Sequence, residues 1–249
     1  MKKVIGKILI VIFIVLLSFG LIIAGTGYNM YKEAIGKTPL DEKVAQIKEK
    51  DNYTTLDEMP DIYKKAVVAV EDHRFYTHGG IDIIAIGRAI WNDIKAMSFV
   101  EGGSTITQQL AKNIYFTQEK ELTRKVAEVF MAFKIEDKYN KNEILELYLN
   151  TSYFGDGYET VKEASRGYFG KEPLELTDYE AVMLAGIPNA PSVYAPTVNL
   201  DLAKQRTKQV IDAMVKYDVI TQDEANRILK EGENYFPSNQ SSNMERLVA

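Results

Sequence analysis

Cysteine is absent from the 249-residue sequence, and histidine occurs only twice. Without cysteine, neither disulfide bonds nor thiolate metal sites can form, and two histidines alone disfavour a zinc site. The sequence also contains no Asp-x-Asp. That absence disfavours the nucleotide-sugar transferases, which hold a metal-bound diphosphate through this motif.

A basic excess is missing as well, because 30 Lys and Arg face 35 Asp and Glu, for a net charge of −5. This balance argues against a nucleic-acid-binding protein. Strictly alternating β-branched runs are lacking, and the hairpin dipeptide Asn-Gly does not occur. With 46% hydrophobic residues the chain can form a substantial core. We therefore predict a mainly α-helical fold.

The longest apolar run lies at the N-terminus, from Ile8 to Ala24, and follows Lys2, Lys3 and Lys7. About 20 apolar residues span a bilayer core, and the preceding lysines predict a cytoplasmic N-terminus. A cleaved signal peptide is the alternative, but the residues around Ala24 match an A-x-A-like cleavage site poorly. We expect residues 1–27 to form a cytoplasmic tip and a single transmembrane anchor, with the remainder extracytoplasmic.

Charge and helical periodicity divide the rest of the chain. Residues 28–55 suit a stalk, residues 56–236 a folded domain, and the polar residues 237–249 a disordered tail. Apolar spacing predicts helices over residues 62–71, 81–96 and 203–217, with two or three more over 121–149. Capping boxes begin at Thr177 and Thr221.

Residues 71–80 read EDHRFYTHGG and hold both histidines of the chain beside Glu71 and Asp72. Carboxylates and imidazoles move protons near neutral pH, so this cluster is a candidate catalytic site. The alternative is a helix end with solvated charges, followed by a turn at Gly79-Gly80. From this segment alone the two interpretations remain open.

Four further segments could carry function. Residues 102–113 read GGSTITQQLAKN, where Ser104 is a candidate N-cap and the helix start suits sugar hydroxyls or a phosphate. Arg124 and Glu128 share a helix face, which alone indicates a surface ion pair. Residues 141–150, KNEILELYLN, and 166–171, RGYFGK, are each explained by helix packing.

Five segments, taken in order, resemble the signatures of the peptidoglycan glycosyltransferases, glycosyltransferase family 51. They are EDHRFYTHGG, GGSTITQQLAKN, RKVAE, KNEILELYLN and RGYFGK. The resemblance extends from about Leu56 to about Leu229 and includes the anchor. The chain has no Ser-x-x-Lys and no Lys-Thr-Gly, so it resembles the monofunctional members. The glycosyltransferase part of a truncated bifunctional penicillin-binding protein would look similar.

The resemblance implies a lysozyme-like helical lobe and a smaller jaw near the membrane, on the outer side of a bacterial cell membrane. It implies polymerisation of lipid II into β-1,4 glycan strands, with inversion, release of undecaprenyl pyrophosphate and inhibition by moenomycin. The implied partners are lipid II, the lipid-linked glycan and the membrane, with transpeptidases or other cell-wall synthesis proteins left open. No organic cofactor and no nucleic acid are implied.

By position, Glu71 matches the general base that deprotonates the acceptor hydroxyl, and Glu128 matches the second carboxylate, which orients the donor or holds a divalent cation such as Mg²⁺. Phe75 and His78 are expected to shape the loop that carries Glu71. Some members carry arginine at the position of Lys120. Lysine keeps the positive charge there but lacks the two-point hydrogen bonding of a guanidinium group. The substrate-binding positions are Arg88, Ser104, Gln108, Gln109, Lys112, Lys120, Arg124 and Lys125.

For the jaw we predict Ile90 to Val100, with Trp91, Met97 and Phe99 at the membrane interface. Ordinary core packing of this segment is the alternative. Two other functions stay open on sequence alone. One is a membrane-anchored muramidase that hydrolyses glycan, and the other is a non-catalytic scaffold for cell-wall proteins.

Overall fold

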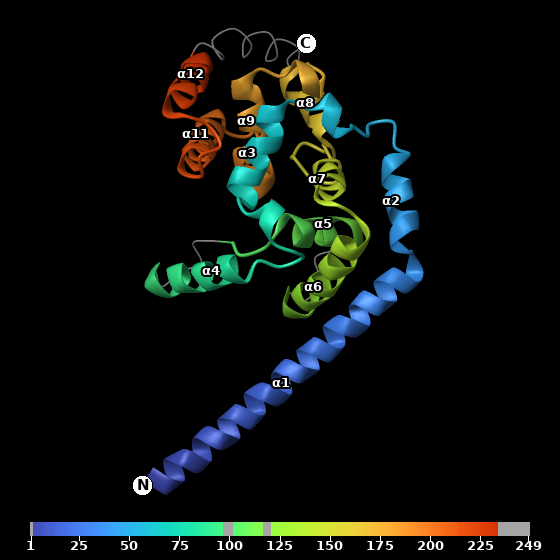
Figure 1. Cartoon of the computed structure of the whole chain (residues 1–249), viewed down its shortest axis with the longest axis vertical. Coiled ribbons are helices and arrows are strands. Elements are labelled where there is room, and N and C mark those ends of the chain that lie inside the picture. Colours follow the sequence, from blue (N-terminus) through green and yellow to red (C-terminus); the bar gives the residue numbers. More distant parts are fainter. Residues whose placement is uncertain (1, 97–101, 117–120, 234–249) are drawn as a thin grey trace. The chain divides into compact units, whose positions relative to one another are not determined.

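The computed structural model describes residues 2–96, 102–116 and 121–233 (Figure 1). Its described residues form helices and no strand, which confirms the mainly α fold. Four short 3₁₀ helices cover Leu56–Glu58, Phe75–Thr77, Pro173–Glu175 and Ile187–Asn189. The α-helices are α1 Lys2–Lys37, α2 Leu40–Lys48, α3 Asp61–Glu71, α4 Ile83–Ala96, α5 Ile106–Tyr115, α6 Glu121–Lys138, α7 Lys141–Leu149, α8 Val161–Phe169, α9 Asp178–Gly186, α10 Pro191–Tyr194, α11 Leu200–Lys216 and α12 Gln222–Glu233.

The chain divides into two compact units, each made of two separate segments. The first unit consists of Met1–Lys48 and His78–Ile144, and the second of Glu49–Thr77 and Leu145–Ala249. The boundary at residues 77 and 78 falls inside the EDHRFYTHGG segment. Glu71 therefore belongs to the second unit and Glu128 to the first.

Helix α1 is continuous from Lys2 to Lys37 and appears in Figure 1 as one long rod. It is the one helix of the described chain that is long and apolar enough to cross a membrane, with a mean hydropathy of 3.1 in its most apolar window. The expected stalk begins with the end of α1, and α2 follows it, burying Leu40, Val44 and Ile47.

Helix α6 organises the first unit, because both α1 and α5 pack against it. Ala127, Met131 and Ile135 of α6 are buried, and α5 contributes Ile106 and Leu110 to the same core. Both helices alternate apolar and polar positions at helical spacing, so each buries one side. Sequence periodicity alone is enough to place this core.

A polar contact joins α5, α6 and the start of α7. The Oε1 atom of Glu136 accepts hydrogen bonds from Thr107 Oγ1 at 2.6 Å and from Lys141 Nζ at 2.7 Å. Thr107 belongs to the GGSTITQQLAKN segment and Lys141 to the KNEILELYLN segment. Two of the sequence motifs therefore meet here through a structural contact.

Helix α9 forms the centre of the second unit. Every residue from Tyr179 to Gly186 is buried, as expected of a helix that is apolar on all sides. Helices α3, α11 and α12 pack against it. The predicted capping boxes are confirmed, since Thr177 caps α9 with Glu180 and Thr221 caps α12 with Glu224.

Gly80 lies directly on the backbone of α6 within the first unit. A Cβ atom at this position would lie 2.9 Å from the carbonyl carbon of Ala132 and 3.0 Å from the amide nitrogen of Phe133. Backbone atoms inside a packed helix cannot give way as a flexible side chain can. The neighbouring Gly79 has no atom within 4 Å of such a Cβ.

We expect Gly80→Ala to lower the free energy of unfolding by about 1–3 kcal/mol, because the new methyl group must displace the loop from α6. Gly79→Ala is the matched control and should change it by less than about 0.5 kcal/mol. Urea unfolding of the two variants, monitored by circular dichroism, measures the difference. Equal stability of the two variants would contradict the close approach of Gly80 to α6.

Candidate active site

Glu71 is the last residue of α3, and the fold of this helix follows from its sequence. Pro60 precedes the first turn with an extended backbone, and Tyr63, Ala66 and Val67 face the core. The helix ends because Asp72 leaves the helical conformation, with φ −160° and ψ 73°. The Glu71 side chain is 10% exposed. The helix predicted for residues 62–71 is confirmed, including its end at Glu71.

Arg206 of α11 lies against Glu71 in the second unit. Its Nη2 atom is 3.9 Å from Glu71 Oε1, and its Nε donates to the carbonyl oxygen of Gly186 at 3.3 Å. Nη1 donates to Gln209 at 3.2 Å, and the guanidinium lies over the ring of Tyr194. This arginine could not be singled out from the sequence, because it is one basic residue among several on an amphipathic helix.

The absence of a side chain at Gly186 makes room for this arginine. A Cβ atom there would lie 2.9 Å from Arg206 Cγ. The aliphatic part of Arg206 therefore packs on the end of α9, while its head group is held by the Gly186 carbonyl. These contacts fix the cation that stands beside Glu71.

Tyr148, from the KNEILELYLN segment, adds a buried phenol near Glu71. Burial raises the pKa of Tyr148 well above its usual value, and the negative charge of Glu71 raises the pKa further. The phenol therefore stays neutral near pH 7. The sequence offered only helix packing for this segment, whereas the fold brings its tyrosine to the candidate catalytic carboxylate.

The other residues of the EDHRFYTHGG segment hold the loop after α3. The His73 ring stacks on Tyr217 at the end of α11, with centroids 3.8 Å apart and an angle of 7° between the planes. Phe75 is fully buried, in agreement with the expectation that it shapes the loop. Within this unit Arg206 of α11 thus contacts Glu71, and Tyr217, the C-cap of the same helix, contacts His73.

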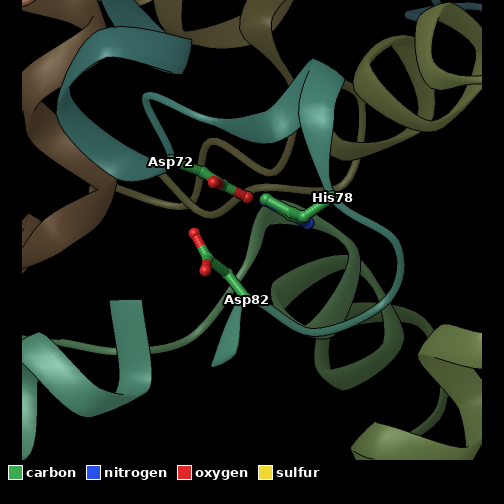
Figure 2. A group of neighbouring side chains, drawn as sticks. All are labelled: Asp72, His78 and Asp82. Carbon is green, nitrogen blue, oxygen red and sulfur yellow. The ribbon is translucent and has the colours of Figure 1, made fainter. Parts of the chain in front are cut away.

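In the first unit the chain continues through His78 and Asp82, which are labelled with Asp72 in Figure 2. His78 Nδ1 lies 2.6 Å from the carbonyl oxygen of Gly79. Asp82 is buried, and its Oδ1 accepts a hydrogen bond from the amide of Ala85 at 2.9 Å. Asp82 therefore caps the first turn of α4.

Glu128 is buried on α6 between two cations. Its side chain is 0% exposed, with Oε1 2.6 Å from Arg124 Nη1 and Oε2 2.7 Å from Lys125 Nζ. The residues are four and three positions apart, so one helix brings all three together. Lys125 Nζ also donates to Ser104 Oγ at 3.0 Å. The structure thus unites four of the residues that the resemblance singled out.

The N-cap of α5 differs by one residue from the expectation. Thr105, rather than Ser104, caps the helix by accepting from the Gln108 amide at 3.1 Å, and it donates to the Gly80 carbonyl at 2.8 Å. Gln108 completes the capping box through its Oε1. Ser104 therefore precedes the helix, and its hydroxyl accepts a hydrogen bond from Lys125.

The remaining predicted binding residues lie on α4 and α5 in the first unit. Arg88, Gln109 and Lys112 are half-buried, and the last two are three positions apart on α5. Their roles in substrate binding remain predictions. Lys120, together with Met97 and Phe99 of the predicted jaw, lies outside the described residues.

The RGYFGK segment contributes a buried ion pair in the second unit. Lys171 Nζ donates to both carboxylate oxygens of Glu180, at 2.9 and 2.8 Å, and the Glu180 side chain is 0% exposed. Glu180 also accepts from the Thr177 amide at 2.7 Å. This motif therefore stabilises the start of α9.

Comparison with known proteins identifies the family. Residues 40–215 match the transglycosylase family model. The chain belongs to the transglycosylase family. The matched region begins at α2 and includes Glu71, the cluster on α6, and Arg206. The family has a lysozyme-like helical fold, which agrees with the expected fold class.

Relatives of this transglycosylase are penicillin-binding proteins. It is 45% identical over 191 residues to penicillin-binding protein 2D of Bacillus subtilis (strain 168), covering 77% of this chain and 28% of the relative. It is 43% identical over 183 residues to penicillin-binding protein 1A of Neisseria flavescens, covering 74% and 23%. The chain thus spans about a quarter of the length of these relatives.

A crystal structure of penicillin-binding protein 1A from Haemophilus influenzae aligns with 72% of this chain and 17% of that one. The alignment has 24% sequence identity and a TM-score of 0.43. A likeness at this level adds nothing to the site.

A divalent cation near Glu128 remains a prediction. Both oxygens of Glu128 already contact a cationic side chain, at 2.6 and 2.7 Å. Mg²⁺ and Ca²⁺ prefer several oxygen ligands and would be repelled by the adjacent guanidinium and ammonium groups. The residues at this position do not fit a resident divalent ion.

We expect Arg124→Met to lower the free energy of unfolding by about 3 kcal/mol, because the buried Glu128 carboxylate loses its less exposed partner. Lys134→Met on the same helix is the control, since Lys134 pairs with the largely exposed Asp137. The control should cost less than about 1 kcal/mol. Chemical denaturation of both variants in detergent measures the difference, and equal losses would contradict a structural role for the Arg124–Glu128 pair.

Proposed function

We propose that the protein is a membrane-anchored peptidoglycan glycosyltransferase. In the proposed reaction it polymerises lipid II into β-1,4-linked glycan, with inversion at the anomeric carbon and release of undecaprenyl pyrophosphate. The observation that carries the proposal is the pair of basic side chains held on α6 by buried Glu128. A diphosphate leaving group requires such a fixed group of cations, and family membership supports the same reaction class.

Glu71 is the proposed general base. Its carboxylate accepts the proton of the acceptor's 4-hydroxyl as the oxygen attacks the anomeric carbon of the donor. The bond from that carbon to the pyrophosphate oxygen breaks, and the pyrophosphate retains the electron pair. Arg206 and Tyr148 support this role, because a fixed cation and a neutral phenol stand near a carboxylate that is only 10% exposed.

Arg124 and Lys125 are proposed to stabilise the leaving pyrophosphate, with Lys112 on α5 as a further donor. Charge-assisted hydrogen bonds to phosphate oxygens are among the strongest available in proteins. Glu128 neutralises one positive charge of the pair and fixes the orientation of both side chains. This arrangement stabilises charge as it develops on the leaving group.

A muramidase would use its acids differently. Hydrolysis of a glycosidic bond needs a carboxylic acid that protonates a sugar leaving group, with a second carboxylate nearby. Glu128 is fully buried, and each of its carboxylate oxygens contacts a cationic side chain, so neither oxygen is placed to reach a sugar leaving group. The contacts around Glu128 therefore favour transfer from a diphosphate over hydrolysis.

Helix α1 is proposed to anchor the enzyme, with the lysines before the apolar run in the cytoplasm and the catalytic residues outside. An apolar stripe on α4 supports contact with the same membrane. The stripe consists of four exposed residues: Ile83 at 74%, Ile84 at 65%, Trp91 at 69% and Ile94 at 67%. At helical spacing they fall within about 100° of the helix circumference. The stripe overlaps the predicted jaw and begins earlier, at Ile83.

We expect Glu71→Gln to lower the rate of lipid II polymerisation by roughly 10²- to 10⁴-fold, the usual contribution of a general base. Glu159→Gln, an exposed carboxylate in the same unit, should retain activity. Gel analysis of glycan strands made from labelled lipid II, with moenomycin as inhibitor, measures both. A Glu71→Gln variant with unchanged polymerisation would refute the proposal, and release of fragments from preformed glycan would favour the muramidase.

Arg206→Met is expected to slow polymerisation by roughly 10- to 100-fold, because Glu71 loses the cation that lies beside its carboxylate. Lys208→Met is the control on the same helix, since Lys208 and its partner Asp212 are each 61% exposed. Initial rates at saturating lipid II distinguish the two variants. Full activity of the Arg206 variant would show that Glu71 is oriented by other contacts.

A further inference from the structure

Helix α6 has two sides with different partners. Thr123, Val126 and Phe130 face α1, whereas Arg124 and Glu128 carry the cation cluster. At about 100° per residue, the centres of these two groups lie on opposite sides of the helix. Because both groups belong to one helix, a shift of α6 along α1 shifts the cluster by the same amount relative to α1.

The contact with α1 is close because of one glycine. A Cβ atom at Gly27 would lie 2.6 Å from both Cβ and Cγ1 of Val126, and 2.9 Å from the carbonyl oxygen of Thr123. Gly20 and Gly25 of the same helix have no atom within 4 Å of such a Cβ. Gly27 is thus the one of these glycines at which the backbones of α1 and α6 nearly touch.

Aromatic side chains fix the same contact along the helix. Tyr28 packs edge-on against Phe130 with centroids 5.1 Å apart, and Tyr31 lies 6.0 Å from both Phe130 and Tyr28. Because these rings follow Gly27 within about one turn, they extend the same interface. Sliding α1 along α6 would separate three rings and bring a larger residue against Val126.

The position of Gly27 in the sequence gives this contact a depth in the membrane. The apolar run starts at Ile8 and its small residues end at Gly27, after which Tyr28 and Tyr31 follow. Tyrosines mark the membrane–water interface at the ends of spanning helices. Val126 therefore meets α1 at the height of the interface, and Glu128 is two residues further on, about 3 Å along the helix axis.

We propose that the contact between Gly27 and α6 sets the depth at which Arg124, Lys125 and Glu128 meet a membrane-bound diphosphate. The inference rests on the proposed function, because a lipid-linked diphosphate is held at the height of the lipid headgroups. A cation cluster displaced from that height cannot reach it without distorting the bilayer. Gly27 and Phe130 are thus positioning residues that act through α6.

The first test compares Gly27→Leu with Gly25→Leu in full-length protein reconstituted in vesicles. Both variants add the same apolar side chain to α1, so insertion into the membrane is matched. Lipid II polymerisation is expected to fall at least tenfold in Gly27→Leu and to stay at the wild-type level in Gly25→Leu. Wild-type rates in Gly27→Leu would overturn the inference, whereas inactive wild-type protein would instead refute the proposed function.

A depth measurement separates this role from a general loss of structure. Since the chain has no cysteine, Leu122→Cys on α6 provides a single site for an environment-sensitive fluorophore. Quenching by lipids brominated at different acyl positions is expected to change in the Gly27→Leu background and not in the Gly25→Leu background. An unchanged quenching profile in the Gly27→Leu protein would overturn the inference.

A third experiment leaves the contact between Gly27 and α6 intact. Three leucines inserted after Leu16 lengthen the span by about 4.5 Å and raise the cluster relative to the bilayer. Polymerisation should fall at least tenfold in bilayers of 18-carbon lipids and recover in bilayers of 22-carbon lipids, whereas wild type should show the opposite preference. Equal rates of both proteins in both bilayers would overturn the inference.

Discussion

The buried carboxylate of Glu128 imposes the constraint on which the first unit depends. An ionised group without exposure is strongly destabilising unless cations accompany it. Arg124 and Lys125 meet this requirement from positions four and three residues earlier on α6. The segment must therefore be helical, and it must be covered by other helices. Packing of α5 against α6 contributes to that cover, and Ser104, just before α5, accepts a hydrogen bond from Lys125.

In the second unit a largely buried carboxylate is likewise accompanied by partner side chains, but these come from residues far apart in the sequence. Glu71 ends α3, Tyr148 comes from α7, and Arg206 comes from α11. Helix α9 brings α3 and α11 together because it is buried from Tyr179 to Gly186. The carboxylate is therefore surrounded by side chains whose positions depend on one central helix. This arrangement makes the site sensitive to the packing of α9.

The remaining motifs have structural roles that support these two sites. Glu136 joins Thr107 to Lys141 in the first unit, and Glu180 joins Lys171 to Thr177 in the second. Each contact links a motif to a helix that carries or supports functional residues. A signature of five segments thus consists of a small number of reactive side chains together with the polar contacts that hold them.

Local features of this protein were determined by the sequence itself. Helical periodicity was sufficient to predict α3 up to Glu71, the pairing of Arg124 with Glu128 and the apolar helix α1, because each depends on residues within a few turns. Capping boxes at Thr177 and Thr221 were equally local. The tertiary structure alone decided that Arg206 and Tyr148 meet Glu71, that Thr105 donates to the Gly80 carbonyl, and that Gly27 meets Val126. These contacts join residues separated by tens of positions, and they exist only once the helices are packed.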